Sequence, residues 1–118
     1  MTRVASLALS VVATDRTFER VTHRGQIVWV GKCIHCGSKL SVGLDGTLFG
    51  DASIEHIVPR AHGGDDDPTN LALACAGCNH EKGRRHDHRA HNDARRIDLQ
   101  QRLQHKRAQR WRDTYPRS

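Results

Sequence analysis

Hydrophobic positions along this chain come in short runs that are separated by turn residues, rather than in long helical stripes. The run Gln26–Val30 is rich in β-branched and aromatic residues, which is typical of a strand. Further on, Leu40–Phe49 carries Asp45-Gly46 between apolar residues, the short-range pattern that favours a β-hairpin. The first half of the chain therefore predicts β structure.

The middle of the chain continues with two more short apolar segments. Ser53–Val58 alternates weakly between apolar and polar residues and stops at Pro59, which indicates a short strand. Leu71–Ala74 is a second run of strand length, and the Gly- and Asp-rich residues 63–68 between the two predict a loop.

Helices are expected toward the C-terminus. One is predicted from Ala76, and Gly83 is expected to end it, because glycine is favoured just after a helix. A second is predicted from about Asp93 to Arg112, although its apolar residues do not align in one stripe, so its packing face is not predicted. With the strands, these helices indicate a small α+β fold.

The composition leaves only a thin core and places the charge unevenly. A chain of 118 residues fits one domain, and only 36% of it is hydrophobic. Residues 1–83 carry 8 Lys/Arg against 9 Asp/Glu, whereas residues 84–118 carry 11 against 4. A basic tail of this kind indicates a partner with a phosphate backbone, and the alternative interpretation is a solvated helix face.

No apolar run approaches the length of about 20 residues that a membrane-spanning helix needs, which argues against an integral membrane protein. Val4–Ala13 has the apolar character of a signal-peptide core, but no convincing cleavage site of small residues follows it. A cytoplasmic location is therefore expected. Export is the alternative, and in that case the cysteines would be expected to form disulfides.

Two Cys-x-x-Cys pairs are the strongest local pattern. Such pairs hold four thiolates at the spacing that a tetrahedral structural Zn²⁺ prefers. The alternatives are a redox pair, which the duplication and the absence of a βαβ pattern disfavour, and buried free thiols. The four predicted zinc ligands are Cys33, Cys36, Cys75 and Cys78.

Between the pairs lies an acidic residue followed by a histidine, Glu55-His56. Neighbouring side chains of a strand point to opposite faces, so these two can serve one site only if the strand bends or the site lies at its end. Pro59 makes a strand end plausible here. Taken alone the pair is weak evidence, because an isolated histidine is usually an ordinary surface or core residue.

The whole stretch resembles the HNH endonucleases, also called ββα-metal or His-Me finger nucleases. The resemblance covers residues 33–83 and includes the acidic-His pair followed by Ile and Pro, a Gly-Gly loop, Asn-Leu, and Cys-x-x-Cys-Asn with a lysine three residues on. It implies that His56 is the general base, that Asn70 orients this base, and that Asn79 takes the third motif position. The chain would then be an HNN variant.

The resemblance also implies a catalytic divalent cation held by Glu55 and Asn79. Their carboxylate and amide oxygens suit Mg²⁺ or Mn²⁺, and the Zn²⁺ of the thiolate site would be a separate metal. Aspartate is commoner than glutamate at the position of Glu55, and the neighbouring His80 is a rival ligand. Adjacent helical positions are about 100° apart, so Asn79 and His80 are not expected to bind one ion together.

These features predict a DNA endonuclease with an N-terminal extension carrying a strand (1–32), a nuclease core (33–85) and a basic helical tail (86–118). Lys82, Arg84 and Arg85 are expected to contact the DNA backbone, with the tail arginines extending the contact. The alternative is a non-catalytic, zinc-stabilised nucleic-acid-binding module. Target preference, biological role, the preferred catalytic metal and oligomeric state are not predicted.

Overall fold

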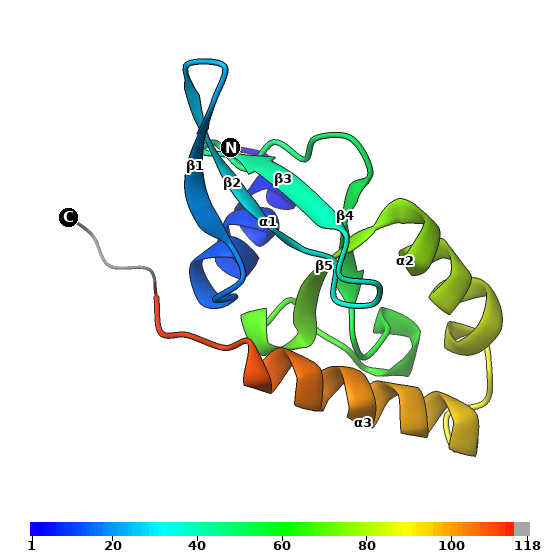
Figure 1. Ribbon diagram of the computed structural model, residues 1–118. Helices are drawn as coiled ribbons and strands as arrows, with labels where there is room; N and C mark the ends of the chain where they lie inside the picture. Colours follow the sequence, from blue (N-terminus) through cyan, green and yellow to red (C-terminus); the bar gives the residue numbers. More distant parts are fainter. Residues whose placement is uncertain (115–118) are drawn as a thin grey trace.

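The N-terminal half forms an antiparallel sheet of three strands in the order β1-β2-β3 (Figure 1). In the computed structural model, which describes residues 1–114, these strands are β1 (Glu19–His23), β2 (Gln26–Lys32) and β3 (Lys39–Gly43). The strand predicted at Gln26–Val30 is thereby confirmed, and it is longer than the pattern indicated. Strand β1 was not predicted, because all five of its side chains are exposed and show no alternation.

The turn expected at Asp45-Gly46 is present, and the residues on its two sides pair with each other as a short hairpin. Gly46 has a φ of 88°, which suits glycine, and Asp45 accepts a hydrogen bond from the backbone of Thr47. Across the turn, Val42 and Leu48 form an antiparallel bridge, and the backbone N–H groups of Gly43 and Phe49 donate to the carbonyls of Thr47 and Ser41. The hairpin is therefore present, with a short second arm, while β3 also pairs along its length with β2.

A ββα unit follows the three-stranded sheet. Strands β4 (Ala52–His56) and β5 (Leu71–Cys75) form a two-stranded antiparallel sheet, and α2 (Ala76–Lys82) begins directly after β5. The connection between the strands contains two short 3₁₀ turns, Arg60–His62 and Pro68–Asn70. This unit matches the predicted strands and helix to within about two residues at each end.

Gly83 does not end the helix in the expected way. It has a right-handed conformation, with φ of −57°, rather than the left-handed one that makes glycine favourable after a helix. The α-helical hydrogen bonds stop at Lys82, and the chain continues as a π-helical turn over Gly83–Asp87. The boundary was predicted, but its physical reason was not.

The N-terminal helix α1 (Arg3–Thr14) packs into the core, against β4 and β5. Its residues Ala8, Val11 and Val12 are buried beside Leu71 and Leu73 of β5. The apolar segment that resembles a signal-peptide core is thus a core helix in this structure. Among the described residues, no helix is long and apolar enough to cross a membrane.

The C-terminal helix α3 (Ala94–Gln109) begins at Asp93, whose side chain caps it by accepting from the backbone of Arg95 and Arg96. Figure 1 shows this helix running along the base of the molecule below β5. Of the predicted tail 86–118, the last four residues lie outside the described residues.

Several basic residues of this tail bind backbone carbonyls of the protein. Arg107 is 1% exposed and donates to carbonyl oxygens of Leu71, Thr14 and Pro68. Further donors to backbone carbonyls outside the tail are Lys106, Arg110 and Arg112. These side chains therefore hold the tail to the core, which neither interpretation of the basic tail had foreseen.

Candidate functional site

The four cysteines come together at one point, where the loop after β2 meets the start of α2. Their sulfur atoms all lie within 4.8 Å of one another, with Cys75 Sγ 3.9 Å from Cys33 Sγ and 3.8 Å from Cys36 Sγ. A tetrahedral zinc with Zn–S bonds of about 2.3 Å separates its sulfur ligands by about 3.8 Å, whereas a disulfide needs about 2.05 Å. The cluster is therefore consistent with a zinc site.

The pKa shifts of Cys36 and Cys78 agree with a zinc site at the cluster. A hydrogen bond with the Ser38 side chain lowers the pKa of Cys36 to about 6, which favours the thiolate that zinc requires. The pKa of Cys78 is raised, first by its hydrogen bond with Cys75 and then by burial. Four thiols this close cannot all ionise without a cation to offset their charges, and Zn²⁺ supplies that charge.

Asn70 pins the connection between β4 and β5. Its Oδ1 accepts from the backbone N–H of Val58 at 2.8 Å, and its Nδ2 donates to the carbonyls of Val58 and Asp65 at 3.1 and 2.9 Å. One amide side chain thus fixes both sides of the loop that follows His56. The family resemblance implied that Asn70 orients the base, and Asn70 is placed in the loop that directly follows His56.

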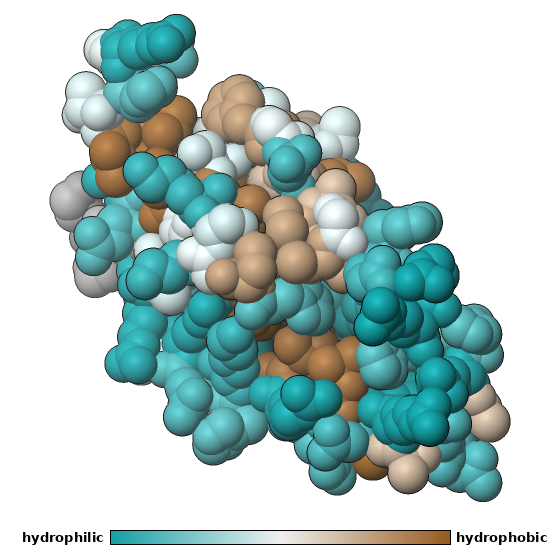
Figure 2. Space-filling model, turned by 45° about the vertical axis from the view of Figure 1, so that its right-hand side comes forward, coloured by the Kyte–Doolittle hydropathy of each residue, from teal (hydrophilic) through white to brown (hydrophobic). Residues whose placement is uncertain are grey.

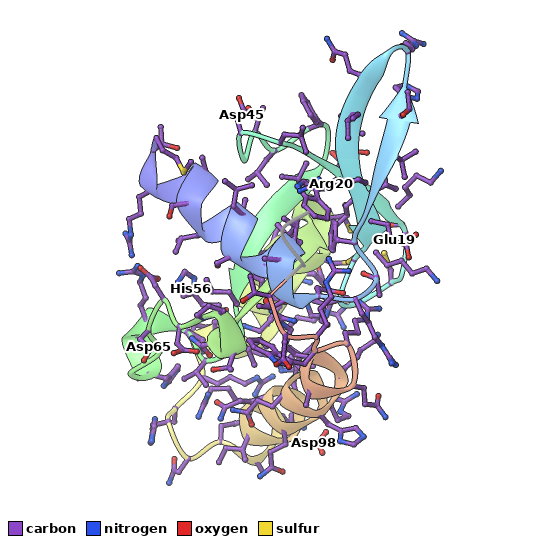
Figure 3. All side chains as sticks on the ribbon, turned by 90° about the vertical axis from the view of Figure 1, so that its left-hand side faces the viewer. Glu19, Arg20, Asp45, His56, Asp65 and Asp98 are labelled. Carbon is purple, nitrogen blue, oxygen red and sulfur yellow. The ribbon has the colours of Figure 1, made fainter. Side chains whose placement is uncertain are left out.

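His56 is the last residue of β4, and its side chain points toward α1 and the loop 63–67. Figure 3 shows it beside the loop that carries Asp65 and close to the N-terminal helix. Its Nε2 lies 2.8 Å from Oδ1 of Asp66, and the imidazole is 22% exposed. It lines a hollow of about 340 Å³ together with Arg3 and Arg60. The imidazole is therefore oriented and open to solvent.

Glu55 precedes His56, but its side chain lies on the other face of β4. It is 1% exposed, and its Oε1 lies 2.6 Å from Nε2 of His35, a residue between Cys33 and Cys36. The second oxygen, Oε2, is buried and has no hydrogen-bond partner within residues 1–114. The alternation expected for a strand is thus observed, and it ties Glu55 to the cysteine cluster.

Asn79 lies on α2 and faces β4. Its Nδ2 donates to Ser53 Oγ at 3.1 Å and to the carbonyl of Ile54 at 2.9 Å, while its Oδ1 has no donor among the described residues. His80 is exposed on the outer side of the same helix. The structure therefore turns Asn79, and not His80, toward the strand that carries Glu55.

The three basic residues expected on the DNA backbone are placed differently from one another. The Lys82 side chain is only 3% exposed and donates to the carbonyl of His56 and to Asp87. Arg84 and Arg85 are 59% and 63% exposed and pair with Glu81. Of the three expected residues, Arg84 and Arg85 are the ones that present their charged groups to solvent. In Figure 2, which brings the right-hand side of Figure 1 forward, hydrophilic residues cover the right-hand part of the surface and hydrophobic residues show near its middle.

Sequence reasoning missed three side chains that shape the site. Asp66 and His35 contact the two members of the acidic-His pair, and Arg3 reaches Asp66 from the start of α1. The acidic run after Gly63-Gly64 was a usable signal for Asp66, because a carboxylate in a loop that returns to the strand end can reach His56. Nothing local in the sequence identifies Arg3, since the contact spans 63 residues.

Comparison with known proteins agrees with this geometry. Residues 33–85 match the HNH endonuclease family, so the chain contains an HNH endonuclease domain. Members of this family are generally phosphodiester hydrolases acting on nucleic acid. No curated protein and no solved structure matches the chain. The matched segment holds the Cys₄ cluster, β4, β5 and α2, whereas α1, β1, β2 and α3 lie outside it.

The divalent cation that the family implies fits the residues at the end of β4. Oε2 of Glu55 and Oδ1 of Asn79, neither of which accepts a hydrogen bond among the described residues, are oxygen donors of the kind that Mg²⁺ and Mn²⁺ prefer, and Asn79 is bonded to Ile54, the residue before Glu55 on β4. A buried carboxylate oxygen without a partner is costly, which a bound cation would offset.

Proposed function

We propose that the protein is a divalent-metal-dependent DNA endonuclease that hydrolyses phosphodiester bonds with His56 as general base. The observation that carries this proposal is the imidazole of His56, which is anchored to Asp66 through Nε2 and whose Nδ1 has no hydrogen-bond partner among the described residues. It stands at the end of a strand whose preceding residue has an unpartnered carboxylate oxygen. A structural role needs neither feature.

In the proposed reaction, Nδ1 of His56 accepts a proton from the attacking water. A neutral imidazole does this through the lone pair of its unprotonated ring nitrogen. Asn70 fixes the loop after β4, so that the ring keeps its position relative to the scissile phosphate. The ββα unit of β4, β5 and α2 would thus act as the ββα-metal core.

Glu55 and Asn79 would hold the catalytic Mg²⁺ or Mn²⁺ through Glu55 Oε2 and Asn79 Oδ1. The cation supplies charge neutralisation at the phosphoryl group and the leaving oxygen. The four cysteines would hold a structural Zn²⁺ that takes no part in the chemistry. Reduced thiolates of this kind suit a reducing compartment such as the cytoplasm.

Arg84 and Arg85 are the proposed phosphate contacts, because they are exposed and lie just after α2. Lys82 is left out of this set, because its buried ammonium group is bound to the carbonyl of His56 and would support the strand end instead. Contacts of this type give affinity without reading sequence.

Nicking of supercoiled plasmid with Mg²⁺ or Mn²⁺ tests the proposal. His56→Ala should lower the rate by about 10²- to 10⁴-fold, the usual contribution of a general base, while its melting temperature stays close to that of the native chain. His80→Ala, an exposed histidine 24 positions further on, is the matched control and should cut normally.

Equal cutting by the native chain and His56→Ala would remove His56 from the role of base. If no metal supported cutting of DNA or RNA by the native chain, the zinc-stabilised nucleic-acid-binding module would be the better account. Binding without cutting would then be measured by the shift of labelled DNA in a gel.

A further inference from the structure

Three nitrogen-bearing side chains converge on the carboxylate of Asp66. His56 Nε2 lies 2.8 Å from Oδ1, and Arg60 Nη2 lies 2.7 and 2.9 Å from the two oxygens. Arg3, from the first turn of α1, also donates to Oδ2. The imidazole of His56 therefore has an ionised carboxylate as its hydrogen-bond acceptor. The guanidinium groups of Arg3 and Arg60 hold this carboxylate in place.

The loop that carries Asp66 is held by its own contacts, independent of the histidine. Asn70 donates to the carbonyl of Asp65, and Gly64 lies so close to the backbone of Val58 that an added Cβ would meet the Val58 oxygen at 1.7 Å. Asp67 closes the far end by accepting from Thr69. Asp66 is thus presented from a constrained turn.

The position of Asp66 determines which ring nitrogen of His56 is free. A carboxylate accepts but does not donate when ionised, so its partner nitrogen must carry the proton. The hydrogen bond from His56, followed by the contact with Arg60, lowers the pKa of Asp66 below its ordinary value, so the carboxylate stays ionised at neutral pH. Nε2 then carries hydrogen, and Nδ1 keeps its lone pair.

We propose that Asp66 is a positioning residue that fixes the ring orientation and the tautomer of His56, so that Nδ1 is the atom that takes the proton from water. This inference rests on the proposed nuclease function. The same logic operates in carboxylate–histidine pairs elsewhere, where the acidic residue holds the imidazole and does not itself react.

The contact that Arg3 makes with Asp66 comes from outside the segment that matches the HNH family. Helix α1 lies before residue 33, yet it delivers a guanidinium group to the carboxylate that orients the proposed base. The N-terminal extension would thereby support the active centre as well as the core.

The test combines nitrogen NMR of the histidine ring with steady-state plasmid nicking. In the native chain, the ¹⁵N shifts of His56 should show hydrogen on Nε2 and a bare Nδ1. Asp66→Asn can turn its amide group toward the ring, so Nε2 becomes an acceptor and the tautomer reverses. In that variant kcat should fall about 10- to 10³-fold with KM nearly unchanged, as expected for a misoriented base.

Two variants complete the design. Asp66→Glu keeps a carboxylate and should restore part of both the native ¹⁵N pattern and kcat. Asp65→Asn changes the neighbouring acid, whose side chain contacts only the backbone of Asp67, and should leave both measurements unchanged.

An unchanged His56 tautomer in Asp66→Asn would overturn the inference. So would a lower KM with kcat unchanged, because Asp66 would then be competing with a DNA phosphate for Arg3 and Arg60. If the native chain cut nothing, the nuclease proposal would fail, but the ¹⁵N pattern would still decide whether Asp66 sets the tautomer.

Discussion

Glu55 and His56 are neighbours in the sequence, but they lie on opposite faces of strand β4. The surroundings of these two faces differ sharply. On the α2 face, Glu55 is buried against His35 of the cysteine cluster, and Asn79 bonds to the strand. On the α1 face, His56 lies in an open hollow beside charged side chains of a loop and a helix. One face is closed and the other is open.

The adjacent pair Glu55-His56 suggests a single task. The different surroundings of the two faces of β4 separate it into two tasks. A closed face provides fixed ligands in a low-dielectric environment, where electrostatic interactions are strong. An open face admits water and a phosphate to the proposed base. The end of β4, where Lys82 holds the carbonyl of His56, is where the two meet.

Loss of zinc should have the largest effect, because the closed face rests on the cysteine cluster. Structural zinc contributes about 10–16 kcal/mol of apparent binding free energy in small modules, which equals or exceeds the stability of a typical domain. Cys75→Ser should therefore abolish the cooperative thermal transition measured by circular dichroism. His80→Ala, in the helix α2 that follows Cys75, should melt normally, and a folded, zinc-free Cys75→Ser chain would refute the structural role of the metal.

Removal of His35 should come next. His35→Leu leaves the side chain of Glu55 buried without its hydrogen-bond partner, and removing one partner from a buried pair of this kind costs about 3–5 kcal/mol. Urea denaturation measures the loss, and zinc content should stay near one ion per chain. His23→Leu, at an exposed position of β1, is the control. A loss below 1 kcal/mol would mean that Glu55 is not held by the closed face.

Arg107 backs the same strands from the C-terminal helix, and its removal should cost about 2–4 kcal/mol. It donates to the carbonyl of Leu71, the register partner of His56, and Arg107→Met would leave several buried oxygens unpaired. Arg102→Met, which changes an exposed arginine of α3, should stay within about 0.5 kcal/mol. If the two variants were equally stable, the basic tail would be a solvated helix face and would not hold the strands in place.

The features that the sequence predicted well are those with a local physical cause. Strand β2, the Asp45-Gly46 turn and the start of α2 follow from composition and spacing over a few residues. The four-cysteine cluster followed from ligand chemistry. These predictions needed no knowledge of what packs against what.

What escaped prediction depends on contacts between distant segments. Arg107 is buried because carbonyls of residues 14, 68 and 71 meet at its guanidinium group, which no local pattern announces. The partners of Glu55 and His56 lie 20 and 10 positions away. Alternation along the strand predicted that Glu55 and His56 point to opposite faces of β4. The residues that surround each face, however, are set by the tertiary fold.

The smallest expected effect concerns DNA binding at the outer surface of the closed side. Replacing both Arg84 and Arg85 by alanine should reduce the slope of log K against log salt by about 2, since each lost phosphate contact changes it by about 0.9. Fluorescence anisotropy at several salt concentrations measures the slope. Lys39→Ala, at an exposed position of β3, is the control, and an unchanged slope in the double variant would place the DNA elsewhere.

We propose that the end of β4 joins two metal centres with different ligands to one open histidine. Anomalous diffraction at the zinc and manganese absorption edges, from crystals grown with Mn²⁺, tests this arrangement. We expect zinc among the four cysteine sulfurs and manganese bound to Glu55 Oε2 and Asn79 Oδ1. Manganese bound instead to Asp66 on the open face, or no second metal at all, would contradict it.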